Sequence, residues 1–481
     1  MILSARWLVP ISSPVIEQGG VVIEGDRIIA FGRIDWVRGQ FPGHPVRDFG
    51  EAAILPGFVN VHSHLELSIL RGYLEGLSFW DWIRRLTWTK YQVLSREDIR
   101  VSALLGAIEA VLSGITTVGD PMDLGASLDA VIRTGLRAVL YQEVFSPDAE
   151  EAESVLAGCK EKLCSLRARI LNWEGLSTED PLDHLIGPPD IVTVGLRKHR
   201  VSLGLSPHAP YTVSAPLFKL VHLLAQAERL PICIHIAESE AESQLLESGS
   251  GPIMDAWQQR GIVWSAPQCT PVEYLHRLGV IGESTLLVHC IRLSDQDFGI
   301  LRATGPSIAH CPKSNWKLRH GTADLKKLRQ GGLRVGLGTD SVASNNNMDF
   351  FEEMRAAYFN PCWSTRPLVK EHAQQTETIG AADILRMATL GGAEALGLAT
   401  RIGSIETDKQ ADLIVIDLSQ IHAQPVYSPV TTLVFSSRSS DVILVMAGGE
   451  VIMEDRRLKG LNLSALREQT ESIRQKLIHV A

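Results

Sequence analysis

The stretch VNVHSHLELS, residues 59–68, combines the pattern of a buried strand with side chains that do not belong in one. Its apolar residues predict a strand in the core: Val59, Val61, Leu65 and Leu67. Among them lie two imidazoles, His62 and His64, and the carboxylate of Glu66. An unpaired buried polar group costs roughly 1–3 kcal/mol, so these side chains need either partners or a function.

The spacing of the two histidines is itself informative. Side chains alternate between the faces of a strand, so His62 and His64 point to the same side and can reach one metal ion. Taken alone, the pair fits equally well with two histidines that are hydrogen-bonded inside the core. The rest of the chain has to decide between these interpretations.

Beyond this stretch, apolar β-rich runs alternate with helical stretches such as residues 96–114 and 215–230. The runs are ILPGFVNVH, ITTVGD, LRAVLYQEVF, VSLGLSPHAP, PICIHIAES, STLLVHC, GPSIAHCP and LRVGLGTDS. About eight strand-then-helix units of this kind predict an α/β fold, a parallel (β/α)₈ barrel of the TIM type.

Both ends of the chain have a different texture, with short strands and turns. VVIEGDRIIAFG is typical of a hairpin with Gly-Asp at its turn, and ADLIVIDL and DVILVMAGGEVIMED repeat the short-strand pattern near the other end. We therefore predict a small β-sandwich domain built from residues 1–56 and 400–455, and a catalytic barrel over 57–399. Residues 456–481 have helical spacing and are expected to pack on the outside.

Polar side chains recur where the predicted barrel strands end, which is where the catalytic groups of such barrels lie. His62 and His64 follow GFVNV, His235 lies in ICIHIAE, and Asp340 ends VGLGTD. Three neutral imidazoles, one carboxylate and an open position for water are typical of a catalytic zinc or iron site. This combination favours the metal-site interpretation of the H-x-H pair.

Three further strand-end residues fit the chemistry of such a site. Glu238 follows His235 with H-x-x-E spacing and is predicted to donate a proton to the substrate and then to transfer another. His289 is predicted to hydrogen-bond the attacking water or the developing tetrahedral oxygen. Asp340 is predicted both to bind the metal and to take the proton of the water.

Taken together, these segments resemble the amidohydrolase superfamily over nearly the whole chain. The branch they resemble contains S-adenosylhomocysteine/methylthioadenosine deaminases, s-triazine chlorohydrolases and aminodeoxyfutalosine deaminases. The matching segments are PGFVNVHSHLELSILRG, SFWDWI, SPHAPYTVS, HIAESEAE, LLVHC, HCPKSN, GLGTDSVASNNNMDFFEEMR and GSIETDKQADLIVID.

The resemblance implies a residue set and an activity. The metal ligands would be His62, His64, His235 and Asp340, and no lysine stands where a two-metal site would need one, which implies a single divalent ion, zinc before iron. His208 and Trp82 would contact substrate. The activity implied is a metal-dependent aminohydrolase acting on a carbon–nitrogen bond other than a peptide bond.

Substrate is where this chain departs from the adenosylhomocysteine-type pattern. The glutamate that holds the ribose hydroxyls in those enzymes falls near Tyr91, and their carboxylate-binding arginine falls near Gln142 and Glu143. The variant H-x-H-L-E-L-S looks more like aminodeoxyfutalosine deaminases, so we expect a deaminase of an aminated purine nucleoside of that kind. An adenosylhomocysteine/methylthioadenosine-type or other heterocycle deaminase, a chlorohydrolase and a cyclic amidohydrolase are the alternatives.

Several residues allow two interpretations. Glu66 lies two residues beyond His64, on the same face if the chain stays extended, and is either a substrate contact or a partner of another group. His310 is either a support of the site or a core residue. His320 lies off the strand-end pattern and is predicted to be a packing or surface residue. Trp80, Trp82 and Trp88 suggest aromatic cover over the barrel mouth, or packing alone.

Composition restricts the class of partner. The net charge is −9 without a Lys/Arg-rich run, which argues against nucleic acid and anionic membranes. Seven scattered cysteines without a C-x-x-C pair indicate a reduced, cytoplasmic protein, and the N-terminal sequence lacks the features of a signal peptide. We expect a small-molecule substrate and, from the resemblance, a homodimer or larger homo-oligomer.

Overall fold

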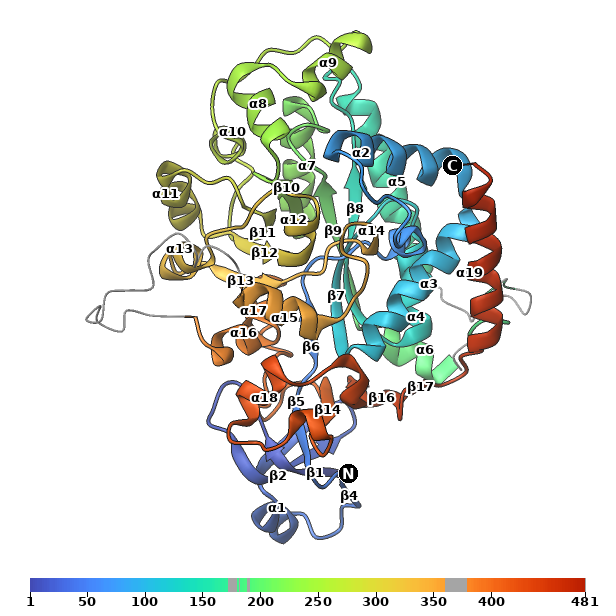
Figure 1. The fold of residues 1–481 in the computed structure, drawn as a ribbon, viewed down its shortest axis with the longest axis vertical. Coiled ribbons are helices and arrows are strands. Elements are labelled where there is room, and N and C mark those ends of the chain that lie inside the picture. The colour runs from blue at the N-terminus through green and yellow to red at the C-terminus, as the bar shows by residue number, and fades with distance from the viewer. Residues whose placement is uncertain (172–179, 181, 188–190, 360–378, 481) are drawn as a thin grey trace.

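The computed structural model describes residues 1–171, 180, 182–187, 191–359 and 379–480, and its centre is an eight-stranded parallel barrel (Figure 1). The strands follow one another in chain order: β6 (Phe58–Asn60), β7 (Ile115–Met122), β8 (Arg137–Val144), β9 (Val201–Pro207), β10 (Ile232–Ile236), β11 (Thr285–His289), β12 (Ser307–His310) and β13 (Arg334–Leu337). Backbone hydrogen bonds from Val61 N to Leu337 O (2.9 Å) and from Asp340 N to His62 O (2.9 Å) close the ring. The predicted barrel is confirmed.

Helices surround the barrel. They are α3 (Arg96–Leu112), α4 (Ala126–Thr134), α5 (Ala152–Leu171), α6 (Ile191–Lys198), α7 (Ala215–Glu228), α8 (Glu240–Ser248), α9 (Pro252–Gln259), α10 (Pro271–Arg277), α11 (Asp295–Thr304), α12 (Pro312–Lys317), α13 (Leu325–Gln330), α14 (Val342–Asn345), α15 (Phe350–Tyr358), α16 (Ala381–Met387) and α17 (Leu390–Ala395). Local sequence starts several of them: the Ser95 hydroxyl accepts from Asp98 N while the Asp98 carboxylate accepts from Ser95 N, a capping box at the start of α3.

The barrel interior is filled by every second residue of its strands. Val59 and Val61, Val139 and Tyr141, and Cys233 meet in one buried cluster with residues of β11 and β12. This period-two pattern decides which later residues of each strand point into the mouth. The next inward positions on β8 and β10 are Glu143 and His235, both of which line the same cavity.

Strands from both ends of the chain form a second sheet. It contains β1 (Ile2–Leu8), β2 (Ile16–Glu24), β3 (Arg27–Arg33), β4 (Val46–Asp48), β5 (Ala52–Pro56), β14 (Leu413–Asp417), β15 (Val442–Ala447), β16 (Glu450–Glu454) and β17 (Arg457–Leu458). Its two parts join where β14 pairs antiparallel with β5. The β2–β3 hairpin turns at Gly25–Asp26, as predicted.

This sheet curls around its own core. Ile28 N donates to Lys409 O (2.9 Å) and Asp408 N to Ile28 O (2.8 Å), which joins β3 to the segment ahead of β14. Apolar residues of β1, β2, β5, β14 and β15 meet inside. The strands therefore enclose one core as in a sandwich, although they belong to one hydrogen-bonded sheet. The remaining elements near it are α1 (Ile34–Gln40) and α18 (Pro429–Phe435).

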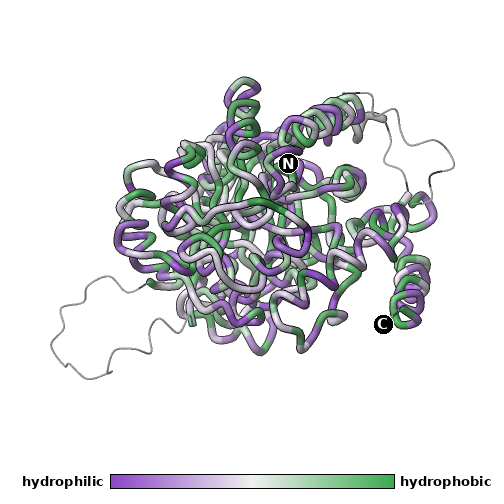
Figure 2. Tube along the Cα trace, turned by 90° about the horizontal axis from the view of Figure 1, so that it is seen from above, coloured by the Kyte–Doolittle hydropathy of each residue, from purple (hydrophilic) through white to green (hydrophobic). Residues whose placement is uncertain are grey.

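The last helix, α19 (Leu463–Ile478), lies along the outside of the barrel against α3 (Figure 1). Hydrophilic and hydrophobic residues alternate along it in Figure 2, and Leu466, Ile473 and Leu477 are buried. Lys476 Nζ lies 2.6 Å from Asp98 Oδ2. Among the described residues, no helix combines the length and apolar character that crossing a bilayer requires.

Candidate metal and active site

The four predicted ligands converge at the mouth of the barrel. His235 Nε2 lies 3.2 Å from His62 Nε2 and 3.4 Å from His64 Nε2. Asp340 Oδ1 lies 3.6 Å from the Nε2 atoms of both His62 and His64. Ligand bonds of about 2.1 Å at tetrahedral angles place neighbouring ligand atoms roughly 3.4 Å apart, so these four atoms fit around one divalent ion.

The hydrogen bonds of the site fix which ring nitrogens face the centre. His235 Nδ1 lies 3.0 Å from His208 O, a carbonyl that can only accept, so Nδ1 carries the proton and Nε2 is free to bind a metal. His62 Nε2 can either donate to this nitrogen or, in the other tautomer, face the same centre as a second ligand atom. A separation of 3.2 Å also matches the distance between two ligand atoms of one metal ion.

Charge and burial favour the same protonation states. Burial lowers the pKa of His62, His64 and His235, which keeps their rings neutral. Burial alone would raise the pKa of Asp340, but its hydrogen bond to His62 and the nearby imidazoles outweigh this and lower it. Neutral imidazoles and an ionised carboxylate are the forms that bind metal.

Surrounding residues orient Asp340. The hydroxyls of Ser314 and Ser344 donate to Oδ2 at 2.6 and 3.0 Å, and the backbone N–H of Ser341 donates to Oδ1 at 2.6 Å. Asn345 Nδ2 donates to Thr339 O at 2.7 Å, which holds the loop after β13. Only a fraction of the carboxylate's lone pairs is left to face the histidines.

The H-x-H segment is held in a similar way. Asp120, on the neighbouring strand β7, accepts from the Ser63 hydroxyl at 2.9 Å and from Leu65 N at 2.8 Å. Ser63, between the two histidines, and Leu65, after them, are therefore both held by Asp120. Fixed ligands of this kind are what a metal site requires.

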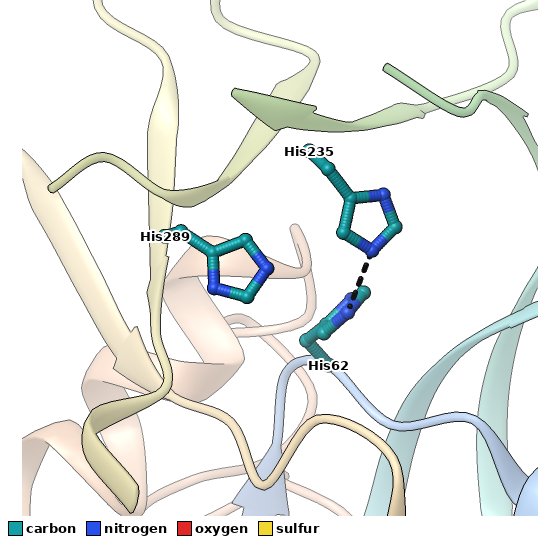
Figure 3. A group of neighbouring side chains, drawn as sticks. All are labelled: His62, His235 and His289. Atoms are coloured by element: carbon teal, nitrogen blue, oxygen red, sulfur yellow. Dashed lines mark hydrogen bonds between the residues drawn. The ribbon is translucent and has the colours of Figure 1, made fainter. Parts of the chain in front are cut away.

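Glu238 and His289 lie beside the four ligands. His289 Nε2 is 3.5 Å from Glu238 Oε1, and His289 Nδ1 lies 2.8 Å from Asn315 Oδ1. Because that amide oxygen accepts, Nδ1 carries the proton in the neutral ring and Nε2 faces the site as an acceptor. Figure 3 shows His62, His235 and His289 pointing toward one another from three parts of the barrel. Burial raises the pKa of Glu238 to about 7, near the pH at which proton transfer in both directions is easiest.

His320 was predicted to be a packing or surface residue, and the structure shows it in the site. Its Nε2 lies 3.5 Å from the same Glu238 oxygen that faces His289. The ring is buried and packs edge-on against Phe79 at 4.4 Å between centroids. No strand-end signal marks His320, because it follows α12 rather than a strand. His320 N donates to Asn315 O at 2.9 Å, which holds the turn that brings His320 back to the mouth.

A cavity of about 1410 Å³ opens over these groups. This exceeds the roughly 300–1,000 Å³ of a typical small-molecule site, so a substrate larger than one ring fits. His208 and Trp82 both line the cavity, and their contact with substrate stays a prediction. The helix α2 (Phe79–Trp88) supplies Trp80, Trp82 and Trp88 to the wall, as aromatic cover over the mouth requires.

Of the three residues predicted to contact substrate, Glu66 is the one that does not line the cavity. The chain does not stay extended after His64: a 3₁₀ helix, η1, runs over Leu65–Leu70 and turns the Glu66 carboxylate away. That carboxylate accepts from Leu124 N at 3.2 Å and Ala126 N at 3.0 Å, at the start of α4. This placement favours a partner of the chain itself over a substrate contact.

His310 lies outside the cavity. It is fully buried on β12, and neither ring nitrogen has a hydrogen-bond partner. Burial lowers its pKa to about 4. Of the two interpretations of His310, this surrounding favours a core residue.

Backbone strain gathers at the ends of three barrel strands. Ala237, His289, Cys290 and Asp340 have positive φ angles of 51°, 74°, 48° and 57°. Residues other than glycine adopt such angles at a cost that the surrounding structure must offset, and they cluster at functional sites. Here they aim Glu238, His289 and Asp340 at one point.

Comparisons with known proteins agree with this geometry. The model of the amidohydrolase family matches residues 53–452. A 5-methylthioadenosine/S-adenosylhomocysteine deaminase of Syntrophobacter fumaroxidans is 31% identical over 458 residues, covering 95% of this chain and 93% of its own. The crystal structure of an adenosine deaminase from Xanthomonas campestris with bound zinc superposes with a TM-score of 0.80 at 27% identity, over 99% of this chain and 98% of that one.

A third protein shares the fold. Helicobacter pylori aminofutalosine deaminase superposes with a TM-score of 0.75 at 21% identity, covering 94% of this chain and all of its own (100%). The family match, the converging histidines and aspartate, and the named relative lead to one conclusion. This chain belongs to the amidohydrolase family, as a hydrolytic deaminase that binds a metal ion.

Proposed function

We propose that this protein removes the exocyclic amino group of an adenine nucleoside, with His62, His64, His235 and Asp340 holding one zinc ion. The observation that carries the proposal is the placement of Glu238 and His289, 3.5 Å apart, beside those four ligands. A deamination needs three proton movements: off the water, onto a ring nitrogen and onto the leaving ammonia. Asp340 and Glu238 divide these tasks between them, and His289 orients the water.

The residue roles follow from position. A divalent ion bound by the three imidazoles and Asp340 supplies the Lewis acid that lowers the pKa of water toward neutrality. Asp340 would take one proton of the attacking water, while Glu238 in its acid form would protonate the ring nitrogen. The Glu238 carboxylate left behind would take the remaining hydroxyl proton as the carbonyl forms and pass it to the amino group, which leaves as ammonia, and the proton held by Asp340 would then return to Glu238. His289, with Nε2 free to accept, orients the water against the amino-bearing carbon.

The nature of the nucleoside is also part of the proposal. The preference for aminodeoxyfutalosine came from the H-x-H-L-E-L-S variant, and its Glu66 and Ser68 are both buried away from the cavity. Ser68 Oγ donates to Leu65 O at 2.9 Å, within its own turn. These two residues therefore do not select a substrate, and the named relatives support a 5′-thio-substituted adenosine first, with aminodeoxyfutalosine as the other nucleoside to test.

The test is a substrate panel with two products scored. The zinc-loaded protein is incubated with 5′-methylthioadenosine, S-adenosylhomocysteine, adenosine and aminodeoxyfutalosine, and ammonia is measured. A chloro-s-triazine and a cyclic amide are run in parallel for chloride release and ring opening. We expect ammonia from at least one nucleoside. Chloride release or ring opening without ammonia from any nucleoside would contradict the proposal, and an elemental analysis without zinc would contradict the metal assignment.

A further inference from the structure

The helix α8 begins with the sequence pattern of a capping box, but the acid of that pattern reaches further back along the chain. Ser239 precedes the helix and Glu242 follows it by three residues, which is the S-x-x-E spacing of the motif. The Ser239 hydroxyl accepts from Glu242 N at 3.2 Å, as the motif requires. The Glu242 carboxyl group accepts from Glu238 N at 2.8 Å and from Ala237 N at 3.1 Å, both ahead of the cap. Glu242 thus holds the backbone of the residue assigned to proton transfer.

The helix after the next barrel strand shows the ordinary form of this motif. At the start of α11, the Asp297 carboxyl group accepts from Ser294 N at 2.8 Å, and the Ser294 hydroxyl accepts from Asp297 N at 3.1 Å. Asp297 and Glu242 are both fully buried. They differ in what they hold, because Asp297 fixes the cap of its own helix and Glu242 fixes two residues before the cap. Capping alone therefore does not explain the reach of Glu242.

One of the residues that Glu242 holds has an unfavourable backbone conformation. Ala237 has a φ of 51°, in the left-handed region that residues other than glycine adopt only at a cost. Ala237 and Glu238 are buried, so their N–H groups need acceptors within the protein. Burial raises the pKa of Glu242 to about 8, and the N–H groups of Glu238 and Ala237 act against this rise. A carboxyl group keeps acceptor capacity in either protonation state, so Glu242 can hold this backbone in both.

The carbonyl of Ala237 is tied to the neighbouring strand β11. Ala237 O accepts from Ile291 N and from Arg292 N, both at 2.9 Å, in the segment directly after His289. Ala237 is therefore held from two sides, by the Glu242 carboxyl group at its N–H and by this segment at its carbonyl. A shift at the end of β10 would move the end of β11 as well.

The position of Glu242 limits what it can do in the reaction. It does not line the cavity, so it touches neither substrate nor a reacting atom. Glu238 does line the cavity, and its Oε1 lies 3.5 Å from His289 Nε2. A misplacement of about 1 Å at a catalytic group can cost about 10²-fold in rate. A residue that fixes the backbone of Glu238 therefore has a large influence on turnover without taking part in the chemistry.

We propose that Glu242 is a positioning residue, whose carboxyl group fixes the backbone of Ala237 and Glu238 and so aims the Glu238 carboxyl group at the reacting atoms. This rests on the proposed function, because proton transfer by Glu238 is part of it. Glu242 itself moves no proton. It offsets the cost of a left-handed residue at the end of β10, and the placement of Glu238 depends on that residue.

The first test separates turnover from binding. Glu242→Met fills a similar volume without an acceptor and should lower kcat by about 10²-fold on the best nucleoside of the panel. KM and zinc content should stay nearly unchanged, because neither the substrate nor a metal ligand loses a contact. Glu242→Gln keeps one acceptor oxygen, so its loss in kcat should be limited to about tenfold, the value of roughly one hydrogen bond. If Glu242→Met does not fold, this tenfold loss in Glu242→Gln is the expected result.

A matched control and a double variant check the route of the effect. Asp297→Asn changes the corresponding buried acid on α11 and should lower the thermal midpoint while keeping the wild-type kcat. In the Glu238→Gln background, Glu242→Met should lower the remaining kcat only slightly, because residues that act through one another are not additive. A further loss as large as in the wild-type background would overturn the proposal, as would wild-type kcat in both Glu242 variants.

Crystal structures of zinc-loaded wild type and Glu242→Met, or Glu242→Gln in its place, need no substrate and keep the two proposals apart. We expect the Glu238 carboxyl group of the variant to leave its place beside His289. An unmoved Glu238 carboxyl group would overturn the positioning role. A displaced carboxyl group, together with ammonia from no nucleoside in wild type, would leave the positioning role intact and overturn the proposed function alone.

Discussion

The barrel has a buried polar cluster at each end, and the two clusters differ in how their side chains are paired. At the mouth, the Nε2 atoms of His62 and His64 lie 3.2 and 3.4 Å from that of His235, as ligand atoms of one metal ion would. At the base, Arg137 donates to both oxygens of Asp412, from Nε and Nη2, at 2.9 Å each. The mouth thus gathers ligand atoms around one point, whereas the base pairs a buried cation with a buried anion.

The difference separates function from assembly. Asp412 precedes β14 and also accepts from Gly448 N at 2.7 Å, so the pair with Arg137 joins the first residue of β8 to the small sheet. Arg197 and Arg200 add a second link, with nitrogen–oxygen distances of 2.6 and 3.0 Å to Glu450. Residues at the N-terminal end of barrel strands are typical of stability and those at the C-terminal end of catalysis. Substitutions at the two ends should therefore fail in different ways.

The largest effect is expected for Glu238→Gln at the mouth. Loss of the proton-transferring carboxyl should lower kcat by about 10²–10⁴-fold, with zinc content unchanged, because Glu238 is not a ligand. The thermal midpoint should stay the same or rise, since a buried carboxyl is removed. Ammonia release, elemental analysis and calorimetric unfolding measure the three quantities. Glu240→Gln, on α8, is the control, and full activity in Glu238→Gln would contradict the assignment.

At the base, Asp412→Ala should lower the free energy of unfolding by about 3–5 kcal/mol, because it leaves the Arg137 guanidinium buried and unpaired. Activity per folded molecule should change little. Denaturant unfolding followed by circular dichroism measures the loss.

The control for Asp412→Ala is Asp35→Ala, which removes an exposed carboxylate from the same small domain. If Asp412→Ala does not fold, the double variant Arg137→Met with Asp412→Leu should recover most of the stability, because a buried pair can be replaced by apolar residues. A large loss of kcat in a stably folded Asp412 variant would contradict the assignment of stability to the base and catalysis to the mouth.

His310 gives a pH dependence with a definite sign. Its pKa in the folded protein is about 4, below the roughly 6.5 of an unfolded histidine, so the unfolded chain binds the proton first. The free energy of unfolding is therefore unaffected by His310 above pH 6.5, and it decreases as the pH falls from 6.5 toward 4 because the unfolded chain takes up the proton. Removing this group with His310→Leu should make stability less dependent on pH between 6.5 and 4, measured by urea unfolding. His276→Leu, at an exposed position on α10, should leave that dependence unchanged.

The smallest effect is expected at His320. Its contact with Glu238 orients the carboxyl but transfers no proton, so His320→Ala should lower kcat by about tenfold with KM nearly constant. His320→Gln keeps a nitrogen near the same place and should recover part of that loss. His222→Gln, on the outer helix α7, is a matched histidine control. Equal effects of His320→Ala and His320→Gln would argue for packing alone.

Sequence patterns predicted the barrel, whose strands and helices alternate regularly along the chain. The eight strands and the inward positions of His62, His235 and Asp340 follow from apolar runs that end in polar residues. The choice between the two interpretations of Glu66 could not be made from the period-two rule, because the chain turns into η1 after His64. His320 could not be found this way, since a post-helical loop brings it to the mouth.

The left-handed backbone at Ala237 affects stability and turnover in different ways. With φ at 51°, this position would be more comfortable as glycine, and Ala237→Gly is a substitution that a screen for heat resistance should find. Its neighbour Glu238 would then sit on a looser hinge. Selection for thermal endurance and selection for turnover should thus pull this single position in opposite directions.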